Sequence, residues 1–137
     1  MRGSCACGGI QYELSDKIFI ANNCHCSTCR KVHGAAFGTF GHAQAKAFRW
    51  LQGEELLIGY GSSEGNVRNF CCICGSNMPS VFLQMNYVRI PLGTLDDDPE
   101  IKPAAHLYVK SRVPWFEIMD DLPQYAGVVD LRELMKQ

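Results

Sequence analysis

Eight cysteines in three short clusters constrain the fold of this 137-residue chain more than any other feature. The clusters are Cys5 and Cys7; Cys24, Cys26 and Cys29; and Cys71, Cys72 and Cys74. At this length about two thirds of the unfolded surface is buried on folding, which is enough for an apolar core without metals or cross-links. Closely spaced cysteines in such a chain are typical of metal ligands or redox groups.

The composition favours one globular domain over residues 1–137, with no linker and no internal repeat. The N-terminus lacks the apolar run of a secretory signal, and no run is long enough to cross a bilayer, so we expect a cytoplasmic protein without a membrane partner. In such a reducing compartment, cysteines are rarely disulfide-bonded. Thirteen basic and fourteen acidic residues, spread without long runs, argue against a nucleic-acid partner.

The first and third clusters together supply the ligands of a structural zinc site. Cys71 and Cys74 are separated by two residues and followed by Gly75, a spacing typical of a zinc knuckle, in which a tight turn brings two thiolates to one ion. Cys5 and Cys7 lie two apart, so on an extended segment their sulfurs would point to the same side. We predict a closed tetrahedral site that ties the N-terminus to the middle of the chain.

Disulfide pairing is the alternative use of these cysteines. Cysteines two residues apart are poorly placed to bridge each other, because the Cα separation and the dihedral angle of a disulfide are narrowly limited. Zinc is therefore favoured over disulfides. Cys72 has no place in this scheme and is interpreted as a spectator thiol, with replacement of Cys71 as a ligand as the alternative.

The middle cluster predicts a second zinc site with a different purpose. Cys24, Cys26 and Cys29 provide three thiolates within six residues, and three protein ligands leave the fourth position of a tetrahedral zinc open to water or substrate. A thiol that enters this position loses its proton, which creates a nucleophile at neutral pH. We therefore predict that the middle cluster is catalytic.

Neighbouring side chains leave alternatives open at this second site. His25 could supply the fourth ligand, although on an extended segment its side chain would point away from the cysteines on either side. Arg30 and Lys31 would offset the negative charge of the site, or bind the carboxylates of a peptide-like substrate. His106, beside apolar residues, is interpreted as a hydrogen-bonded core histidine, with a catalytic role as the alternative.

Short apolar segments between glycine-rich turns predict a mainly β fold with few short helices. Strand length, β-branched or aromatic content and flanking breakers favour strands at residues 10–14, 36–40, 56–60, 67–70 and 87–92. Ser27 could cap a short helix that runs to His33 and ends at Gly34. Residues 129–135 could form a second one.

Three motifs follow one another in order along the chain. They are Gly3-Ser4-Cys5-Ala6-Cys7-Gly8-Gly9-Ile10, Cys24-His25-Cys26-Ser27-Thr28-Cys29-Arg30-Lys31 and Phe70-Cys71-Cys72-Ile73-Cys74-Gly75-Ser76. Together they resemble the motifs of the glutathione-dependent formaldehyde-activating enzyme family, which includes centromere protein V. The resemblance continues through His106 to Trp115 and Leu122-Pro123, so it spans nearly the whole chain.

The resemblance implies a fold, a metal content and an activity. The fold would be the β-tent, in which several small antiparallel sheets are pinned by zinc. Two zinc ions per chain are implied, the structural one at Cys5, Cys7, Cys71 and Cys74, and the catalytic one at Cys24, Cys26 and Cys29. The activity would be the reversible joining of glutathione and formaldehyde to S-hydroxymethylglutathione, which is a carbon–sulfur lyase reaction.

Two other functions are alternatives at this stage. A zinc-stabilised binding module without activity would have its second site closed by His25 or another residue. A thiol redox or metal-handling protein would use its thiolates directly. The enzyme needs an open metal site, the module a closed one, and the redox protein thiols that cycle. The geometry of the middle cluster is therefore the feature that separates these functions.

Overall fold

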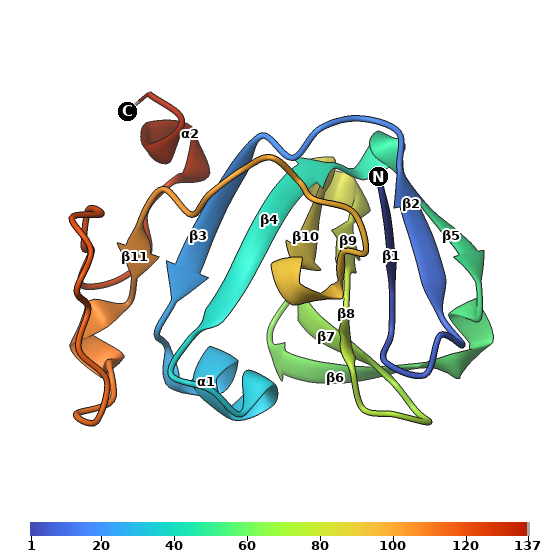
Figure 1. The fold of residues 1–137 in the computed structure, drawn as a ribbon, viewed down its shortest axis with the longest axis horizontal. Helices are drawn as coiled ribbons and strands as arrows, with labels where there is room; N and C mark the ends of the chain where they lie inside the picture. The colour runs from blue at the N-terminus through green and yellow to red at the C-terminus, as the bar shows by residue number, and fades with distance from the viewer. Residues whose placement is uncertain (137) are drawn as a thin grey trace.

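Three small β-sheets form the framework of the protein in the computed structural model, which describes residues 1–136 (Figure 1). The first sheet contains β1 (Arg2–Ser4), β2 (Gln11–Leu14) and β5 (Phe48–Gln52). The central sheet has the order β11 (His106–Leu107), β3 (Ile20–Cys24), β4 (Gly38–Gln44), β10 (Tyr87–Pro91) and β9 (Ser80–Phe82). The third contains β6 (Leu57–Ser63), β7 (Asn66–Cys71) and β8 (Asn77–Met78). The predicted mainly β fold of small sheets is confirmed.

One face of the central sheet forms the main apolar core. Val88 lies opposite Ala43, and Ile90 opposite Gly41, in the antiparallel register of β10 and β4. The side chains of Ala43, Val88 and Ile90 are fully buried and pack in the same cluster as Tyr12 of β2. Because burial of an aliphatic side chain is worth about 1.5–3 kcal/mol, this face holds the central sheet against the first sheet.

The opposite face of the central sheet carries polar and reactive side chains. Asn22 lies opposite Phe40 in the pairing of β3 with β4, and Arg89 lies opposite His42 in the pairing of β10 with β4. Directly opposed residues share a face, and so do residues two apart on one strand. Cys24, two residues after Asn22, therefore lies on this same face. These five side chains form one continuous surface that becomes the floor of the cavity described below.

The first sheet is fastened to the segment after β10. The backbone N–H of Arg2 donates to a carboxylate oxygen of Asp97 at 2.6 Å, and the hydroxyl of Ser4 donates to Asp96 at 2.8 Å. The hydroxyls of Tyr12 and Thr94 share a further hydrogen bond of 2.7 Å. Figure 1 shows the first sheet at one end of the molecule and β11 at the other. These contacts fix the loop that follows β1 and carries the first cysteines.

Five of the strands coincide with those expected from the sequence, and β3 is the most important one that was missed. Its residues Asn22 and Asn23 are poor strand formers, so the segment gives no strand signal. Both are buried and satisfied, because the Asn22 amide oxygen accepts from His42 at 2.8 Å and that of Asn23 accepts from Thr39 at 2.8 Å. The sheets are antiparallel, as expected, except where β11 pairs with β3 in parallel.

The first expected helix is present, but its cap differs from the prediction. The helix α1 (Ser27–His33) ends at Gly34, whose φ of 59° is left-handed, as a terminal glycine allows. The N-cap is Cys26 rather than Ser27, because the Cys26 sulfur accepts a hydrogen bond from the backbone N–H of Cys29 at 3.3 Å. The helix therefore starts from a predicted metal ligand.

The second expected helix is shorter than predicted. The helix α2 (Leu131–Leu134) starts at Asp130, whose carboxylate accepts from the backbone N–H of Arg132 at 2.9 Å. Leu134 is buried in a small cluster with Ile20 and Leu107, so α2 covers the β3 and β11 end of the central sheet. Within residues 1–136 there is no helix with the length and apolar character that a membrane span requires.

Candidate metal centres

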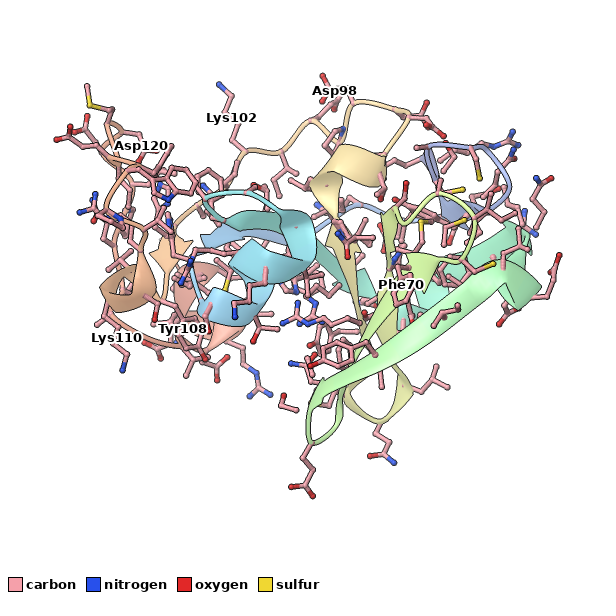
Figure 2. The ribbon with its side chains drawn as sticks, turned by 90° about the horizontal axis from the view of Figure 1, so that it is seen from below. Phe70, Asp98, Lys102, Tyr108, Lys110 and Asp120 are labelled. Atoms are coloured by element: carbon pink, nitrogen blue, oxygen red, sulfur yellow. The ribbon has the colours of Figure 1, made fainter. Side chains whose placement is uncertain are left out.

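Two groups of cysteine sulfurs converge in the structure. The first group is Cys5, Cys7, Cys71 and Cys74, and the second is Cys24, Cys26 and Cys29. Within each group all ligand sulfurs lie within 4.8 Å of one another. Figure 2 shows Phe70, the residue before Cys71, well apart from Tyr108, which packs on the second group. The sets are the ones expected from the sequence, and they form two separate centres.

Two tight turns build the first group. The backbone N–H of Gly75 donates to the carbonyl of Cys71 at 2.9 Å, and that of Gly8 donates to the carbonyl of Cys5 at 2.8 Å. Both glycines have a φ of 74°, which a residue with a Cβ rarely adopts. The tight turn predicted after Cys71 is present. The extended segment expected from Cys5 to Cys7 is wrong, because a turn rather than a strand aims these sulfurs.

Sulfurs of the first group change one another's acidity. A hydrogen bond with the Ser76 hydroxyl lowers the pKa of Cys74 to about 5. A backbone N–H of Gly9 favours the Cys7 thiolate, but the neighbouring sulfurs of Cys5 and Cys74 outweigh it and raise the pKa of Cys7 to about 12. Neighbouring thiolates repel, so the group cannot ionise completely without a cation.

Cys72 stands outside the first group. Its side chain is exposed, and its backbone N–H donates to the carbonyl of Leu56 at 2.9 Å. Cys71 is buried and is the one of these two neighbours whose sulfur joins the group. The interpretation of Cys72 as a spectator thiol therefore agrees with the geometry, and the alternative in which it replaces Cys71 does not.

The second group lies where β3 ends and α1 begins. Cys24 is the last residue of β3, Cys26 caps α1, and Cys29 lies in the first turn of that helix. Hydrogen bonds with the thiols of Cys24 and Cys29 lower the pKa of Cys26 to about 2, and the positive charge of Arg68 acts in the same direction. The pKa of Cys24 is raised, chiefly by its bond to Cys26. Without a cation, the three sulfurs share one negative charge.

Both groups have the donor chemistry of a tetrahedral thiolate site. A Zn–S bond of about 2.3 Å places two sulfurs of a tetrahedron about 3.8 Å apart. The sulfurs of Cys5 and Cys7 are 3.4 Å apart, and those of Cys7 and Cys71 are 3.9 Å apart, on either side of that value. Both groups could hold a metal ion. Four sulfurs complete the coordination of the first, and three leave one position free in the second.

His25 is turned away from the second group. Its ring is fully buried, and its Nε2 shares a hydrogen bond of 2.8 Å with Nδ1 of His106. Nε2 of His106 lies 3.0 Å from the carboxylate of Asp120, which lies in the loop labelled in Figure 2. Because that carboxylate accepts a hydrogen bond from Nε2–H of His106, Nδ1 of the neutral His106 ring accepts one from Nε2–H of His25. The alternative of His25 as fourth ligand is therefore not supported, and the core interpretation of His106 is confirmed.

A cavity of about 440 Å³ opens beside the second group. The three cysteines form part of its wall, and Asn22, Phe40 and His42 of the central sheet form part of its floor. The remaining walls come from the β6–β7 hairpin, from β10 and from the segment after β11. The volume lies within the range of small-molecule sites, which is about 300–1,000 Å³. The open cysteine group therefore faces a space that a small molecule can enter.

Two arginines that sequence reasoning missed line this cavity. They are Arg68 of β7 and Arg89 of β10. The signal that could have found Arg89 is a lone arginine in the otherwise apolar strand β10, whereas β7 also contains Asn66 and Asn69 and gives no such signal for Arg68. Arg30 donates from Nε to the backbone carbonyl of His25 at 3.3 Å. Neither Arg30 nor Lys31 lines the cavity. Their predicted contact with a substrate carboxylate stays a prediction.

Tyr108 was also not singled out as a functional residue. It lines the cavity and packs against the second group. Its φ of 56° is left-handed, which for a residue with a large side chain costs about 1–3 kcal/mol and is most often seen at functional sites. Burial, together with the negative charge of Cys24, raises the pKa of its hydroxyl. A protonated phenol therefore lies beside the cysteine sulfurs at neutral pH.

Comparisons with known proteins agree with this picture. A family model described as Glutathione-dependent formaldehyde-activating enzyme matches residues 1–111, which include all three cysteine clusters. A crystal structure of a Rhodobacter sphaeroides protein is similar to this chain with a TM-score of 0.59 and 23% identity, covering 75% of this chain and 92% of that one. No curated protein matches the chain. The structural similarity concerns the fold alone.

The two groups predict the metal content of the purified protein. We expect about two divalent ions per chain, because each group brings its cysteine sulfurs within 4.8 Å of one another, close enough to share one ion. Elemental analysis of protein prepared with zinc in excess measures this ratio. A value that stayed at one ion per chain would show that one group does not bind metal, and the Cys26→Ser and Cys74→Ser variants would identify which.

Matched cysteine substitutions predict that the two centres differ in their link to folding. Cys74→Ser should lower the free energy of unfolding by about 3 kcal/mol or more, because the affinity of a structural site for its metal is part of the folding free energy. Cys26→Ser should cost much less, since serine is a good N-cap and the second group closes no long loop. Chemical denaturation measures both. Equal losses would make the second group structural as well.

Proposed function

This chain belongs to the glutathione-dependent formaldehyde-activating enzyme family, and we propose that it is a zinc-dependent carbon–sulfur lyase acting on adducts of small thiols with small aldehydes. Glutathione is the proposed thiol and formaldehyde the proposed aldehyde, with S-hydroxymethylglutathione as the adduct. We propose zinc for both cysteine groups, and a cytoplasmic location, where reducing conditions preserve thiolate ligands. The paragraphs below give the support for each part.

A single observation carries the proposal: three cysteine sulfurs converge on the wall of a cavity large enough for a peptide-sized thiol. In the described residues 1–136, no fourth ligand side chain joins this group, and His25 is engaged with His106 instead. An open position beside a substrate-sized space is the feature that separates catalytic from structural zinc. It favours the enzyme over the binding module with a closed site.

The zinc ion would supply a Lewis acid that lowers the pKa of an incoming thiol. The chain then has to hold both reactants and supply one proton. The thiol gives up its proton, the sulfur electron pair forms the C–S bond with the aldehyde carbon, and the carbonyl π pair moves to oxygen. The oxygen takes up one proton, which completes the hydroxymethyl adduct. In the reverse direction the C–S bond breaks and the same proton leaves the oxygen.

Tyr108 is our candidate for holding that proton. Its phenol lies beside the sulfur group and stays protonated at neutral pH, because burial and nearby negative charge raise its pKa. A neutral hydroxyl can donate a hydrogen bond to the aldehyde oxygen as negative charge develops there. The left-handed backbone at this residue supports a role beyond packing.

Arg30 and Lys31 keep the role proposed from the sequence as one of two possible positions for the substrate carboxylates. Arg30 contacts the carbonyl of His25, so its charge lies near the loop that carries the second group. In this position it would offset the charge of the metal site in any case. A charge reversal at Arg30 separates the two roles, because loss of a carboxylate contact weakens glutathione binding without releasing the metal.

The first prediction of this proposal is that zinc-loaded protein binds glutathione at the second group and catalyses adduct formation. Calorimetry with glutathione and NMR of labelled formaldehyde measure binding and rate. Cys26→Ser should abolish the catalysed rate, whereas Cys72→Ser, which changes an exposed sulfur outside both groups, should retain it. X-ray absorption showing a fourth protein ligand at the second site would contradict the proposal and favour the binding module.

A redox protein would behave differently in the same experiment. If the three thiols cycled, added oxidant would form a disulfide among them, release the metal and leave no dependence of any rate on formaldehyde. Mass spectrometry of the oxidised and reduced protein detects that change. Reversible disulfide formation at the second group, in protein without lyase activity, would replace the enzyme by the redox function.

The second prediction concerns Tyr108. Tyr108→Phe keeps the ring and removes the hydroxyl, so kcat should fall about 10²-fold while the affinity for glutathione is retained, as expected for loss of a positioned proton donor. Steady-state kinetics and calorimetry separate the two quantities. Tyr60→Phe is the matched control, because Tyr60 is exposed on β6. An unchanged kcat in Tyr108→Phe would show that the hydroxyl takes no part in catalysis.

A further inference from the structure

We propose that Arg68 and Arg89 form a carboxylate-binding subsite in the cavity, which selects thiols that carry a carboxylate. This subsite rests on the proposed function, because it would bind the carboxylate of a thiol substrate whose sulfur lies at the second cysteine group.

Arg89 is held in a fixed position on the cavity floor. Its guanidinium lies 5.3 Å from the centre of the Phe40 ring and 5.4 Å from that of the Phe82 ring. Its Nη2 donates to the side-chain oxygen of Asn66 at 3.0 Å. Burial is the main cause of its lowered pKa, with the positive charge of Arg68 adding to it. Two rings and one amide therefore orient a cation that water solvates poorly.

Arg68 approaches the same space from β7. Its side chain is 9% exposed, and its Nε donates to the hydroxyl of Ser62 at 3.2 Å. It lines the same cavity as Cys24, Cys26 and Cys29. The two arginines thus extend from the neighbourhood of the cysteines along the cavity. A bound molecule with its sulfur at the cysteines would have its other end beside them.

The two arginines lack a carboxylate partner. In the part of the chain that the structure describes, the ion pairs join Arg49 to Glu13, His106 to Asp120 and Lys136 to Glu133, and none of them includes Arg68 or Arg89. Two like charges that are partly desolvated and unpaired are unfavourable, and proteins rarely keep them without a function. An anionic ligand is the missing partner that this arrangement fits.

The charge count indicates how much negative charge the ligand brings. Three thiolates and one divalent ion sum to −1, and two guanidinium groups add +2, which leaves the cavity at +1. His42 adds nothing, because burial lowers its pKa to about 4 and keeps it neutral. While the thiol of the ligand still carries its proton, one carboxylate neutralises the site, whereas a phosphate dianion would overshoot. Arginine forks also match the planar geometry of a carboxylate.

The test uses full-length, zinc-loaded protein and three probes. Glutathione carries the thiol and the carboxylates, its dimethyl ester carries the thiol alone, and S-methylglutathione carries the carboxylates without a free thiol. We expect wild-type protein to bind glutathione at least about tenfold more tightly than the ester, which is the worth of one charge-assisted hydrogen bond. Arg89→Gln and Arg68→Gln should remove this preference and leave ester binding unchanged.

Controls separate a lost contact from a lost fold. Arg49→Gln changes an exposed arginine on β5, outside the cavity, and should keep the preference. Arg89→Lys retains a charge without the fork and should recover part of it. If a glutamine variant unfolds, Arg89→Lys and the comparison of glutathione with its dimethyl ester in wild-type protein still test the subsite in folded protein.

Each remaining outcome decides one question. Equal binding of glutathione and its ester by wild-type protein would overturn the subsite and leave the lyase proposal standing. Binding of S-methylglutathione that depends on Arg89, without binding of any free thiol, would support the subsite and overturn the lyase proposal. If Arg30→Glu lost the preference for glutathione over its ester and the Arg68 and Arg89 variants kept it, the carboxylate-binding position would be on α1 instead. Displacement of glutathione by inorganic phosphate more readily than by acetate would overturn the choice of carboxylate.

Discussion

Thiol groups held within 4.8 Å of one another cannot all lose their protons unless a cation lies among them. In the first group this constraint acts across the chain, because the turn after β1 and the turn after β7 must meet for four sulfurs to converge. A bound ion would therefore close a loop of about sixty residues. The first sheet, held at Arg2 by the loop at Asp97, and the third sheet, whose strand β7 ends at Cys71, meet at this group.

The second group depends on local structure instead. Its three sulfurs come from six consecutive residues at the end of β3 and the start of α1, so no distant segment has to meet for it to form. The loop is supported from behind by His25, whose hydrogen bond to His106 also joins β3 to the parallel strand β11. Because this group joins no distant segments, a metal bound here would not need a fourth protein ligand to hold the chain together, and its fourth position can stay open.

The sequence was sufficient to predict both cysteine groups and insufficient to predict the cavity. Cysteine spacing is local and specific, so the ligand sets, the helix at Ser27–His33 and the exclusion of Cys72 could be read directly. The strand β3 could not, because Asn22 and Asn23 become strand residues only through partners supplied by β4. The walls of the cavity come from four separate parts of the chain, and no periodic pattern connects them.

The same limit applies to the charged residues that line the cavity. Arg30 and Lys31 follow a ligand in sequence, but a helix turns them out of the cavity, whereas Arg68 and Arg89 reach it from other strands. Four thiolates and a divalent ion carry −2, and at the first centre the exposed sulfurs let water solvate that charge. At the second centre two guanidinium groups reverse the sign of the local charge. The two centres thus use the same ligand chemistry, and the arginines make only one of them attractive to an anion.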